Sequence, residues 1–176
     1  MHRKNRLANV RGMIKRMASG LVLAVSLAGW AQAADLPARA PGLWRSSTSV
    51  TGPDGQTVAR DVVTLTCIDP ATDQAFLLSG QSRCSKLNIS GAGADYKING
   101  TCAQPGGTVT IDETLHYASH KDVQLKADVH DAAGEMSLTS ALQWQGLCLP
   151  GMQPGDEGRE VNGAFVKTGN INDPQS

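Results

Sequence analysis

Apolar and polar residues alternate along much of this chain, most regularly between Thr108 and Trp144. Three segments there carry an apolar residue at every second position, and the short turn-like stretches ASHK and DAAG separate them. A period of two residues is typical of a β-strand with one buried and one solvated face. Because the connections are short, the three segments are predicted to form an antiparallel meander.

The alternation also predicts which side chains share a face of the meander. One face takes the apolar members, namely Val109, Ile111, Leu115, Tyr117, Val123, Leu125, Ala127, Val129, Met136, Leu138, Leu142 and Trp144. The other takes polar members, among them Thr114, His116, Gln124, Lys126 and Thr139. If Val129 lies opposite Met136, then Ala127 lies opposite Leu138 on the same apolar face, and Val123 lies opposite Leu142.

Upstream segments complete the predicted fold. Residues 43–51, 57–67, 83–90 and 95–103 are compatible with strands and are separated by Gly, Pro and Asp. The stretch DPATDQAFLLSG predicts one short helix, with Asp69 as its cap, Pro70 at its first position and Gly80 at its end. We therefore expect a mainly β fold: an antiparallel meander of about seven strands, curved or partly barrel-like, with one short helix and two disulfides.

Residues 1–33 differ from the rest of the chain. They hold six Lys or Arg residues and no acid, followed by an apolar run of 13 residues and the small residues AQA. This is the pattern of a secretory signal cleaved after Ala33, and the run is too short to span a bilayer, which takes about 20 residues. The expected organisation is a signal at 1–33, a single domain at 34–156 and a partly disordered tail at 157–176, in which VNGAFV is a possible short strand.

The basic residues of the expected signal, here called the leader, offset an acidic surplus in the rest of the chain. After residue 33 there are 10 Lys plus Arg and 16 Asp plus Glu, so a formal charge of zero becomes about −6. Without a basic cluster, this surface does not suit nucleic acid. No membrane span is expected after the leader.

All four cysteines follow the leader, at positions 67, 84, 102 and 148. An even number in an exported chain, without a CxxC pair, predicts two disulfides rather than a metal site. A hairpin centred on Gly93 would set Cys84 opposite Cys102, although Cys84 then has the wrong parity unless a bulge or the start of the strand lies near Ser85. By elimination, Cys67 pairs with Cys148.

Four features stand in order along the chain: PGLW at Pro41 to Trp44, TCIDPATDQAFL at Thr66 to Leu77, the pair Cys84 and Cys102, and GLCLPGMQPGD at Gly146 to Asp156. With them the chain resembles the exported bacterial proteins catalogued as domain of unknown function 3617. The resemblance covers roughly residues 41–156 and implies a periplasmic or envelope β-rich domain without an established activity. Arg45 stands where that family usually has an acid.

Metal and cofactor sites find little support. Cys148 and Met152 are four residues apart, as soft copper ligands are, but no histidine lies in their loop and Cys148 is needed for a disulfide. His116 and His120 have helical spacing for zinc, yet the alternation places them at a strand end and in a turn, with His130 on a neighbouring strand. We expect no metal site, no cofactor and no catalytic constellation.

Three residues remain as candidates for ligand binding. Trp44 and Trp144 suit a core or a cleft, and Glu113 is turned toward the apolar face, where burial raises a carboxyl pKa. We expect a non-enzymatic, periplasmic or secreted protein whose partner is a small apolar ligand or an envelope protein. The alternatives are a structural or protein-interaction module, and a metal-dependent or acid/base enzyme that uses Glu113 and a nearby histidine.

Overall fold

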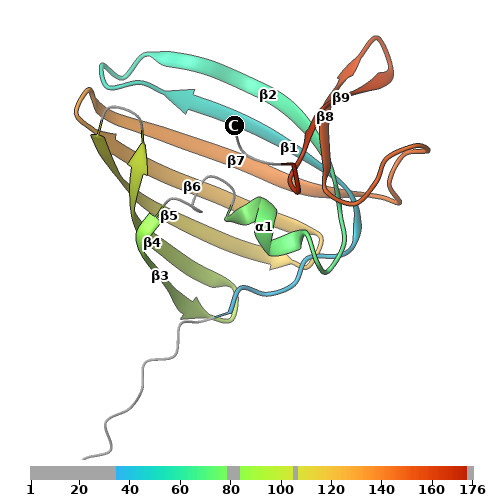
Figure 1. Ribbon diagram of the computed structural model, residues 1–176, viewed down its shortest axis with the longest axis horizontal. Helices are drawn as coiled ribbons and strands as arrows, with labels where there is room; N and C mark the ends of the chain where they lie inside the picture. The colour runs from blue at the N-terminus through green and yellow to red at the C-terminus, as the bar shows by residue number, and fades with distance from the viewer. Residues whose placement is uncertain (1–34, 79–83, 105–106, 174–176) are drawn as a thin grey trace, which may run out of the picture. The chain divides into compact units, whose positions relative to one another are not determined.

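The computed structural model of the protein describes residues 35–78, 84–104 and 107–173. Antiparallel strands form one open sheet in the order β3-β4-β5-β6-β7-β1-β2-β8-β9, and the short helix α1 lies over it (Figure 1). The elements are β1 (Gly42–Thr51), β2 (Thr57–Ile68), α1 (Asp73–Leu77), β3 (Cys84–Ala92), β4 (Asp95–Gln104), β5 (Gly107–Ser119), β6 (Asp122–Asp131), β7 (Gly134–Gly146), β8 (Asp156–Val161) and β9 (Ala164–Asn170). The predicted fold class is confirmed, but the sheet has nine strands rather than seven and does not close.

The central meander has the predicted register. Val129 of β6 lies opposite Met136 of β7, and the pairs Ala127 with Leu138 and Val123 with Leu142 follow. Strands β3 to β7 are neighbours in chain order, and β1 then pairs with β7. Because a one-residue slip would turn every apolar side chain to the opposite face, the alternation specifies this register strongly.

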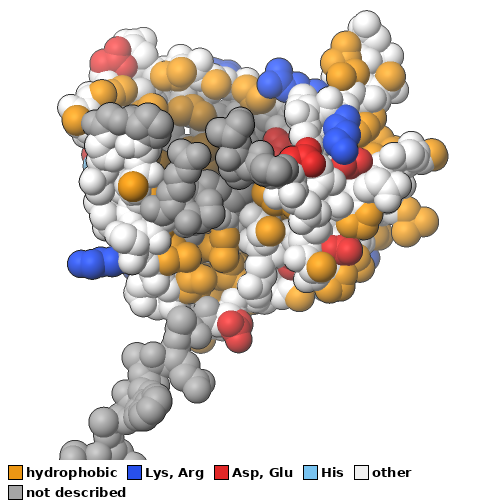
Figure 2. All heavy atoms as spheres, viewed as in Figure 1, with side chains coloured by type: hydrophobic (Ala, Val, Ile, Leu, Met, Phe, Trp, Pro, Cys, Tyr) orange, Lys and Arg blue, Asp and Glu red, His pale blue; other side chains and the backbone are white. Residues whose placement is uncertain are grey.

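The apolar members of the alternation form what we call the core face of the sheet. Its buried cluster joins strand residues to the helix and to the segment before β1; the members are Leu36, Trp44, Ile68, Leu77, Ile98, Leu115, Tyr117 and Val123. Figure 2 views this face and shows hydrophobic side chains gathered near its middle and along the β2 margin. Ile98 and Val123 are fully buried, so this cluster is the main core.

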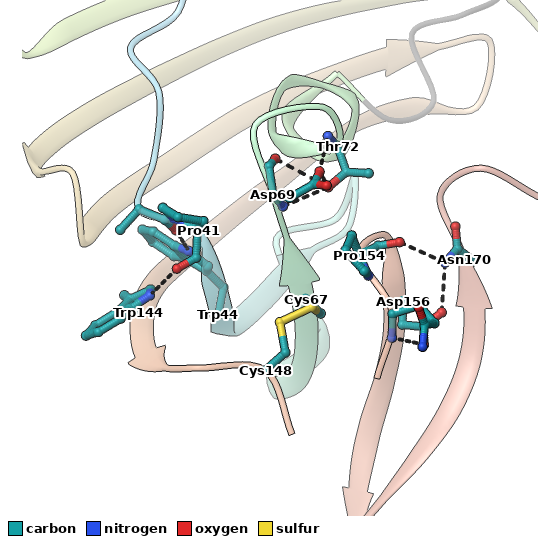
Figure 3. The surroundings of a disulfide bond; sticks show 12 residues. Pro41, Trp44, Cys67, Asp69, Thr72, Trp144, Cys148, Pro154, Asp156 and Asn170 are labelled. Atoms are coloured by element: carbon teal, nitrogen blue, oxygen red, sulfur yellow. Dashed lines mark hydrogen bonds between the residues drawn. A yellow bond between two sulfur atoms is a disulfide. The ribbon is translucent and has the colours of Figure 1, made fainter. Parts of the chain in front are cut away.

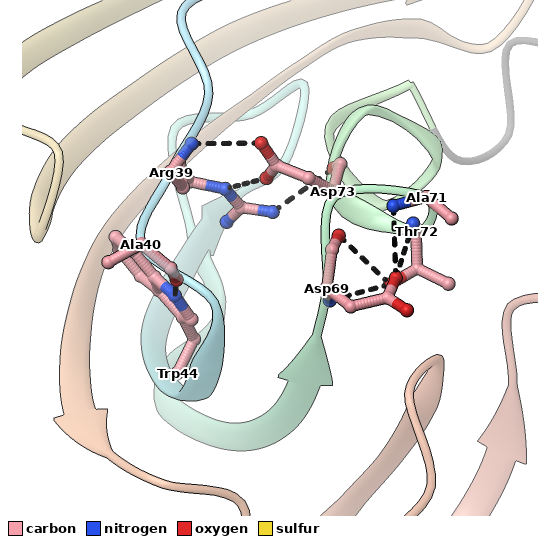
Figure 4. A network of polar contacts seen from close by, with 7 residues as sticks. All are labelled: Arg39, Ala40, Trp44, Asp69, Ala71, Thr72 and Asp73. Atoms are coloured by element: carbon pink, nitrogen blue, oxygen red, sulfur yellow. Dashed lines mark hydrogen bonds and ion pairs between the residues drawn. The ribbon is translucent and has the colours of Figure 1, made fainter.

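Residues 36–41, here called the strap, are tied to α1 by a buried ion pair (Figure 4). The Arg39 Nε atom donates to Asp73 Oδ1 at 2.7 Å, the Arg39 backbone N–H donates to Asp73 Oδ2 at 2.9 Å, and Arg39 Nη2 donates to the Asp73 carbonyl at 3.2 Å. The Arg39 guanidinium also lies over the Trp44 ring, 4.9 Å from its centroid. One residue thus joins the strap, the helix and the first strand.

The helix is shorter than the sequence predicts. It begins at Asp73, with Thr72 as its N-cap, so Asp69 is not the cap and Pro70 precedes the helix rather than opening it. Gly80 lies outside the described residues. Asp69 Oδ1 accepts hydrogen bonds from the backbone N–H groups of Ala71 and Thr72 and from the Thr72 hydroxyl. Asp69 therefore forms a turn before the helix, which is the local bonding that Asp commonly offers the backbone.

A second, smaller core lies on the opposite side of β1 and β2. Leu43, Leu65 and Cys67 are buried there beneath Met152, which belongs to residues 147–156, here called the clasp. The Cys67–Cys148 disulfide anchors the clasp to β2 (Figure 3). The Gly155 N–H also donates to the Cys67 carbonyl at 2.8 Å. The clasp therefore covers one end of a face that is polar elsewhere.

The expected tail supplies the two additional strands. Strands β8 and β9 form a hairpin whose turn holds Asn162 and Gly163 with positive φ angles of 51° and 77°. Asn-Gly is the dipeptide that two-residue hairpin turns favour, because both positions need positive φ. The hairpin joins the sheet where β8 pairs with Leu65 and Thr66 of β2.

The second disulfide joins Cys84 to Cys102, which are register partners in the β3–β4 hairpin. The register shifts between Cys84 and Lys86, so the parity conflict is resolved by a bulge at Ser85, one of the two alternatives considered from the sequence. Both disulfides follow the pairing favoured by the sequence.

The expected signal at residues 1–33 lies outside the described residues. Within the described ranges, no helix has the length and apolar character needed to cross a membrane.

Candidate functional site

A groove crosses the sheet on the side opposite the core face, and we call this side the grooved face. The groove has a volume of about 790 Å³ and is lined by residues of strands β1 to β7. Its walls are two rows of side chains that alternate along each strand with residues of the core face. The polar half of the sequence alternation therefore builds the groove.

The first wall, here called the lysine row, follows one line of cross-strand neighbours. Its members are Ser90, Lys97, Thr114, Lys126, Thr139 and Ser49. Adjacent strands lie about 4.8 Å apart, so the row presents a polar side chain at each such step across the sheet. This regular spacing suits a ligand that extends across the strands.

The second wall, here called the histidine row, lies two residues away along each strand. Its members are Asp95, His116, Gln124, Ala141 and Ser47. His116 Nδ1 lies 2.8 Å from Asp95 Oδ1, so the charge of this carboxylate has a partner within its own row. The groove floor is the backbone of Gly91, Tyr96, Leu115, Leu125 and Ser140, which occupy the core-face positions between the two walls.

A smaller hollow of about 220 Å³ adjoins the lysine row on the side away from the histidine row. Asp112 and Asp128 line it and are direct cross-strand neighbours. Asp112 accepts a hydrogen bond from Asn99 Nδ2, and Asp128 Oδ1 accepts one from Ser137 Oγ at 2.6 Å. Among the ion pairs formed within the described residues, none involves Lys97 or Lys126.

Glu113 lies on the core face, as the alternation predicts. It is 6% exposed and sits between Ile98 and Ala127 in the cross-strand register. Burial raises the pKa of Glu113 to about 7, because the apolar surroundings disfavour the charged carboxylate. The groove lies on the other side of the sheet, so this carboxyl does not face it.

The structure does not bring Glu113 together with the histidines. His116 lies on the grooved face of the same strand, and His130 Nδ1 lies 3.5 Å from Glu135 Oε2 on that face too. His120 is in the β5–β6 turn, where its carbonyl accepts a hydrogen bond from the Ala40 N–H. Among the described residues, no group of three or more His, Cys, Asp and Glu side chains is placed to hold a metal ion.

The two candidate tryptophans are register partners on the core face. Trp44 is 1% exposed, and its Nε1 donates to the Ala40 carbonyl at 2.8 Å. Trp144 is half-buried, and its Nε1 donates to the Pro41 carbonyl at 3.0 Å (Figure 3). Both indoles therefore hold the strap against the sheet, and neither lines the groove.

Gly42 explains part of the PGLW motif beside these tryptophans. Its φ is +129°, and a Cβ atom there would lie 2.1 Å from the Gly146 carbonyl oxygen. That separation is far below van der Waals contact, so the close pairing of β1 with the end of β7 requires glycine at this position.

The structure does not leave Cys148 and Met152 available as copper ligands. Cys148 is bonded to Cys67, and Met152 is 8% exposed against Leu43 and Leu65. A thiolate is the ligand that such a site would need, and the disulfide removes it. The loop therefore forms the clasp over the second core.

Asp156 holds the end of the clasp through three hydrogen bonds, of which Figure 3 shows the one from Asn170. Its carboxylate accepts from the Gln153 N–H at 2.9 Å, from Lys167 Nζ at 2.6 Å and from Asn170 Nδ2 at 2.7 Å. These donors, with the Gln153 N–H foremost, lower the pKa of Asp156 to about 2. Lys167 and Asn170 lie on β9, so Asp156 joins the clasp to the terminal hairpin.

Sequence reasoning placed several groove residues on one face but did not identify the groove. Thr114, His116, Gln124, Lys126 and Thr139 are all on the predicted polar face. Lys97 and Ser49 come from strands whose register the sequence left open. The sequence signal that could have identified the site is the set of polar residues in the alternation. They form the groove walls once they are grouped by their cross-strand neighbours instead of by their order along one strand.

The comparisons with known proteins give a family but no activity. A family described as "Protein of unknown function (DUF3617)" matches residues 39–148, which is more than half of the chain. No curated protein matches the chain. The match begins at Arg39 of the strap and ends at Cys148 of the clasp, so it includes both disulfides and the groove strands β1 to β7 and leaves out the terminal hairpin. The chain therefore belongs to this family of proteins of unknown function.

Proposed function

We propose that the protein is a non-enzymatic binding protein of the bacterial envelope, and that its groove holds a linear, hydroxyl-rich chain such as a glycan. The observation that carries this proposal is the groove itself, whose volume of about 790 Å³ lies within the usual range for ligand sites, roughly 300–1,000 Å³. Its two polar walls at strand spacing favour an extended ligand over a compact one.

The chemistry of the walls supports a polar ligand. Ser47, Ser49, Thr114 and Thr139 offer hydroxyl groups, and Gln124 offers an amide that both donates and accepts. These groups match the alternating donors and acceptors of sugar hydroxyls. The floor is backbone already engaged in the sheet, so it provides a flat surface that a sugar ring can pack against.

The envelope location rests on three features of the chain. The leader at residues 1–33 reads as a signal, two disulfides are typical of an oxidising compartment, and the remaining sequence has an acidic surplus that suits no nucleic acid. A periplasmic protein of this kind meets glycans at the cell wall and at the membrane surface.

Blocking the groove tests the proposal. Ala141→Trp enlarges a member of the histidine row so that its indole fills the groove, whereas Gln145→Trp adds the same side chain to the same face of β7, two residues beyond Gln143 and outside the groove. Titration calorimetry with dextran oligosaccharides and oligogalacturonates should show binding by the unaltered protein and by Gln145→Trp, and loss of binding by Ala141→Trp. Equal binding by the two variants would overturn the assignment of the groove.

A second candidate, the small apolar ligand expected from the sequence, is favoured by one row of the core face. Leu87, Gly100, Ile111, Val129 and Met136 follow one another across the sheet, and the two end members are 40% and 38% exposed. Native mass spectrometry of protein isolated from periplasm tests this candidate. A retained lipid that Met136→Asp abolishes would favour it over the groove, and a bare protein mass would count against it.

A further inference from the structure

Two lysines bear on the charge of the ligand in the groove, an inference that rests on the proposed function. Lys97 of β4 and Lys126 of β6 stand on either side of Thr114 in the lysine row. They are separated by two strand spacings, so their side chains start about 10 Å apart. Both are exposed and both line the groove.

Three carboxylates surround this pair of lysines, and each one is engaged elsewhere. Asp95 lies 2.8 Å from His116, Asp112 accepts from Asn99, and Asp128 accepts from Ser137 at 2.6 Å. This is unexpected in a chain whose acids outnumber its bases after residue 33, because acidic partners are plentiful. The neighbouring acids are thus held by amide, hydroxyl and imidazole groups, and the two ammonium groups remain available to a ligand.

Position decides what a ligand in the groove would meet first. Asp112 and Asp128 lie one row beyond the lysines, in the adjoining hollow, and do not line the groove. Two other acids do line it: Asp95, which pairs with His116 in the opposite wall, and Asp61 of β2, beside Ser49 and three strands from Lys126. An anionic group held at the lysine row therefore meets Lys97 and Lys126 before it meets Asp112 or Asp128, and it lies far from Asp61. Lysine binds anions as a point charge with rotatable donors, so it tolerates both carboxylate and phosphate groups.

We propose that the groove binds an anionic, hydroxyl-rich chain, with a carboxylate or phosphate group of the ligand between Lys97 and Lys126 and its hydroxyl groups along Ser47, Ser49 and Thr139. The lysine half of the groove selects for the anion. The half at β7 and β1, where the side chains are small, accommodates the neighbouring unit of the chain.

The test compares ligands of matched length on the disulfide-bonded protein. Oligogalacturonates supply carboxylates, phosphorylated mannan oligosaccharides supply phosphates, dextran oligosaccharides are neutral, and oligoglutamate is an anionic peptide. Exposed ion pairs contribute up to about 1 kcal/mol, which corresponds to about fivefold in affinity. Lys97→Gln and Lys126→Gln should each weaken anionic glycan binding by up to about fivefold, and the double variant by about tenfold or more.

Lys86→Gln is the matched control, because Lys86 lies on the same face of β3, does not line the groove, and loses the same charge. It should leave affinity unchanged, and raising the salt concentration should weaken anionic binding by the unaltered protein but not by the double variant. The two glycan arms distinguish carboxylate from phosphate. Equal losses in Lys86→Gln, or tighter binding of oligoglutamate than of either glycan, would overturn the inference.

The outcome separates this inference from the proposed function. Neutral dextran that binds as tightly as the anionic chains, with loss in Ala141→Trp, would leave the groove as a glycan site and refute its charge preference. The absence of binding by every chain would refute both.

Discussion

The two faces of the sheet come from the same strands and differ in almost every physical respect. On the core face, side chains such as Ile98 and Leu115 are buried under α1 and the strap. On the grooved face, Lys97 and Thr114 from the same strands are exposed, and the clasp covers the end near β1 and β2. Residues on the core face are explained by packing. The polar rows of the grooved face line the groove and are largely exposed, and we propose that they contact the ligand.

The largest expected effect is the difference between the two faces in how far a substitution lowers the free energy of unfolding. Trp44→Ala removes a fully buried indole and should lower the free energy of unfolding by about 4 kcal/mol, since large-to-small core substitutions leave a cavity. Thr139→Ala on the grooved face should change it by less than about 0.5 kcal/mol. Urea unfolding of both variants, with the disulfides intact, measures the contrast. Similar losses in both would mean that the grooved face is also structural.

The buried ion pair of the strap gives the next largest effect. Arg39→Gln leaves the Asp73 carboxylate buried without its cation and should cost about 3 kcal/mol. Arg39→Met combined with Asp73→Leu removes both charges and should cost less than the single change, because no unpaired charge remains. Thermal unfolding at pH 7 compares the two. If the double variant were the less stable one, the strap would depend on the ion pair itself rather than on apolar cover.

Glu113 makes the stability of the core face depend on pH. Its pKa is about 7 in the folded protein against 4.5 for the free group, so between these values the unfolded chain releases a proton that the folded protein keeps. The stability contributed by this group therefore falls as pH rises from 4.5 to 7. Glu113→Gln should match the unaltered protein at pH 4 and exceed it by about 2–3 kcal/mol at pH 8. Parallel stability curves across this range would contradict the raised pKa.

The smallest effect is local and concerns the covered end of the grooved face. Asp156→Ala removes the acceptor shared by Gln153, Lys167 and Asn170 and should free the clasp and hairpin while the Cys67–Cys148 bond holds. Amide hydrogen exchange should quicken in residues 150–170 and stay unchanged in β5 and β6. Faster exchange throughout the sheet would instead show that the clasp supports the main core.

The strand register and the disulfides could be predicted because they follow from short-range patterns. Alternation paired Val129 with Met136, and the Gly93 turn set Cys84 opposite Cys102, with the bulge at Ser85. The terminal hairpin was underestimated, although Asn162 and Gly163 carry a strong turn signal. Few apolar residues follow Asp156, so the alternation there is weak.

The groove and the strap could not be read from the sequence for a different reason. Arg39 and Asp73 are 34 residues apart, and no local pattern pairs them. The groove needs Ser49 beside Thr139 and Lys97 beside Thr114, which depends on the order of strands as well as on their periodicity. Its hollow depends on how the sheet bends, and alternation carries no information about bending.

The most direct test of this assignment is an NMR titration of the ¹⁵N-labelled, disulfide-bonded protein with oligogalacturonate. We expect amide shifts in the lysine and histidine rows, centred on Lys97, Thr114 and Lys126, and none around Leu87 or Met136. Shifts confined to the Leu87–Met136 row, or no shifts at a saturating ligand concentration, would contradict a polar binding groove on this face of the sheet.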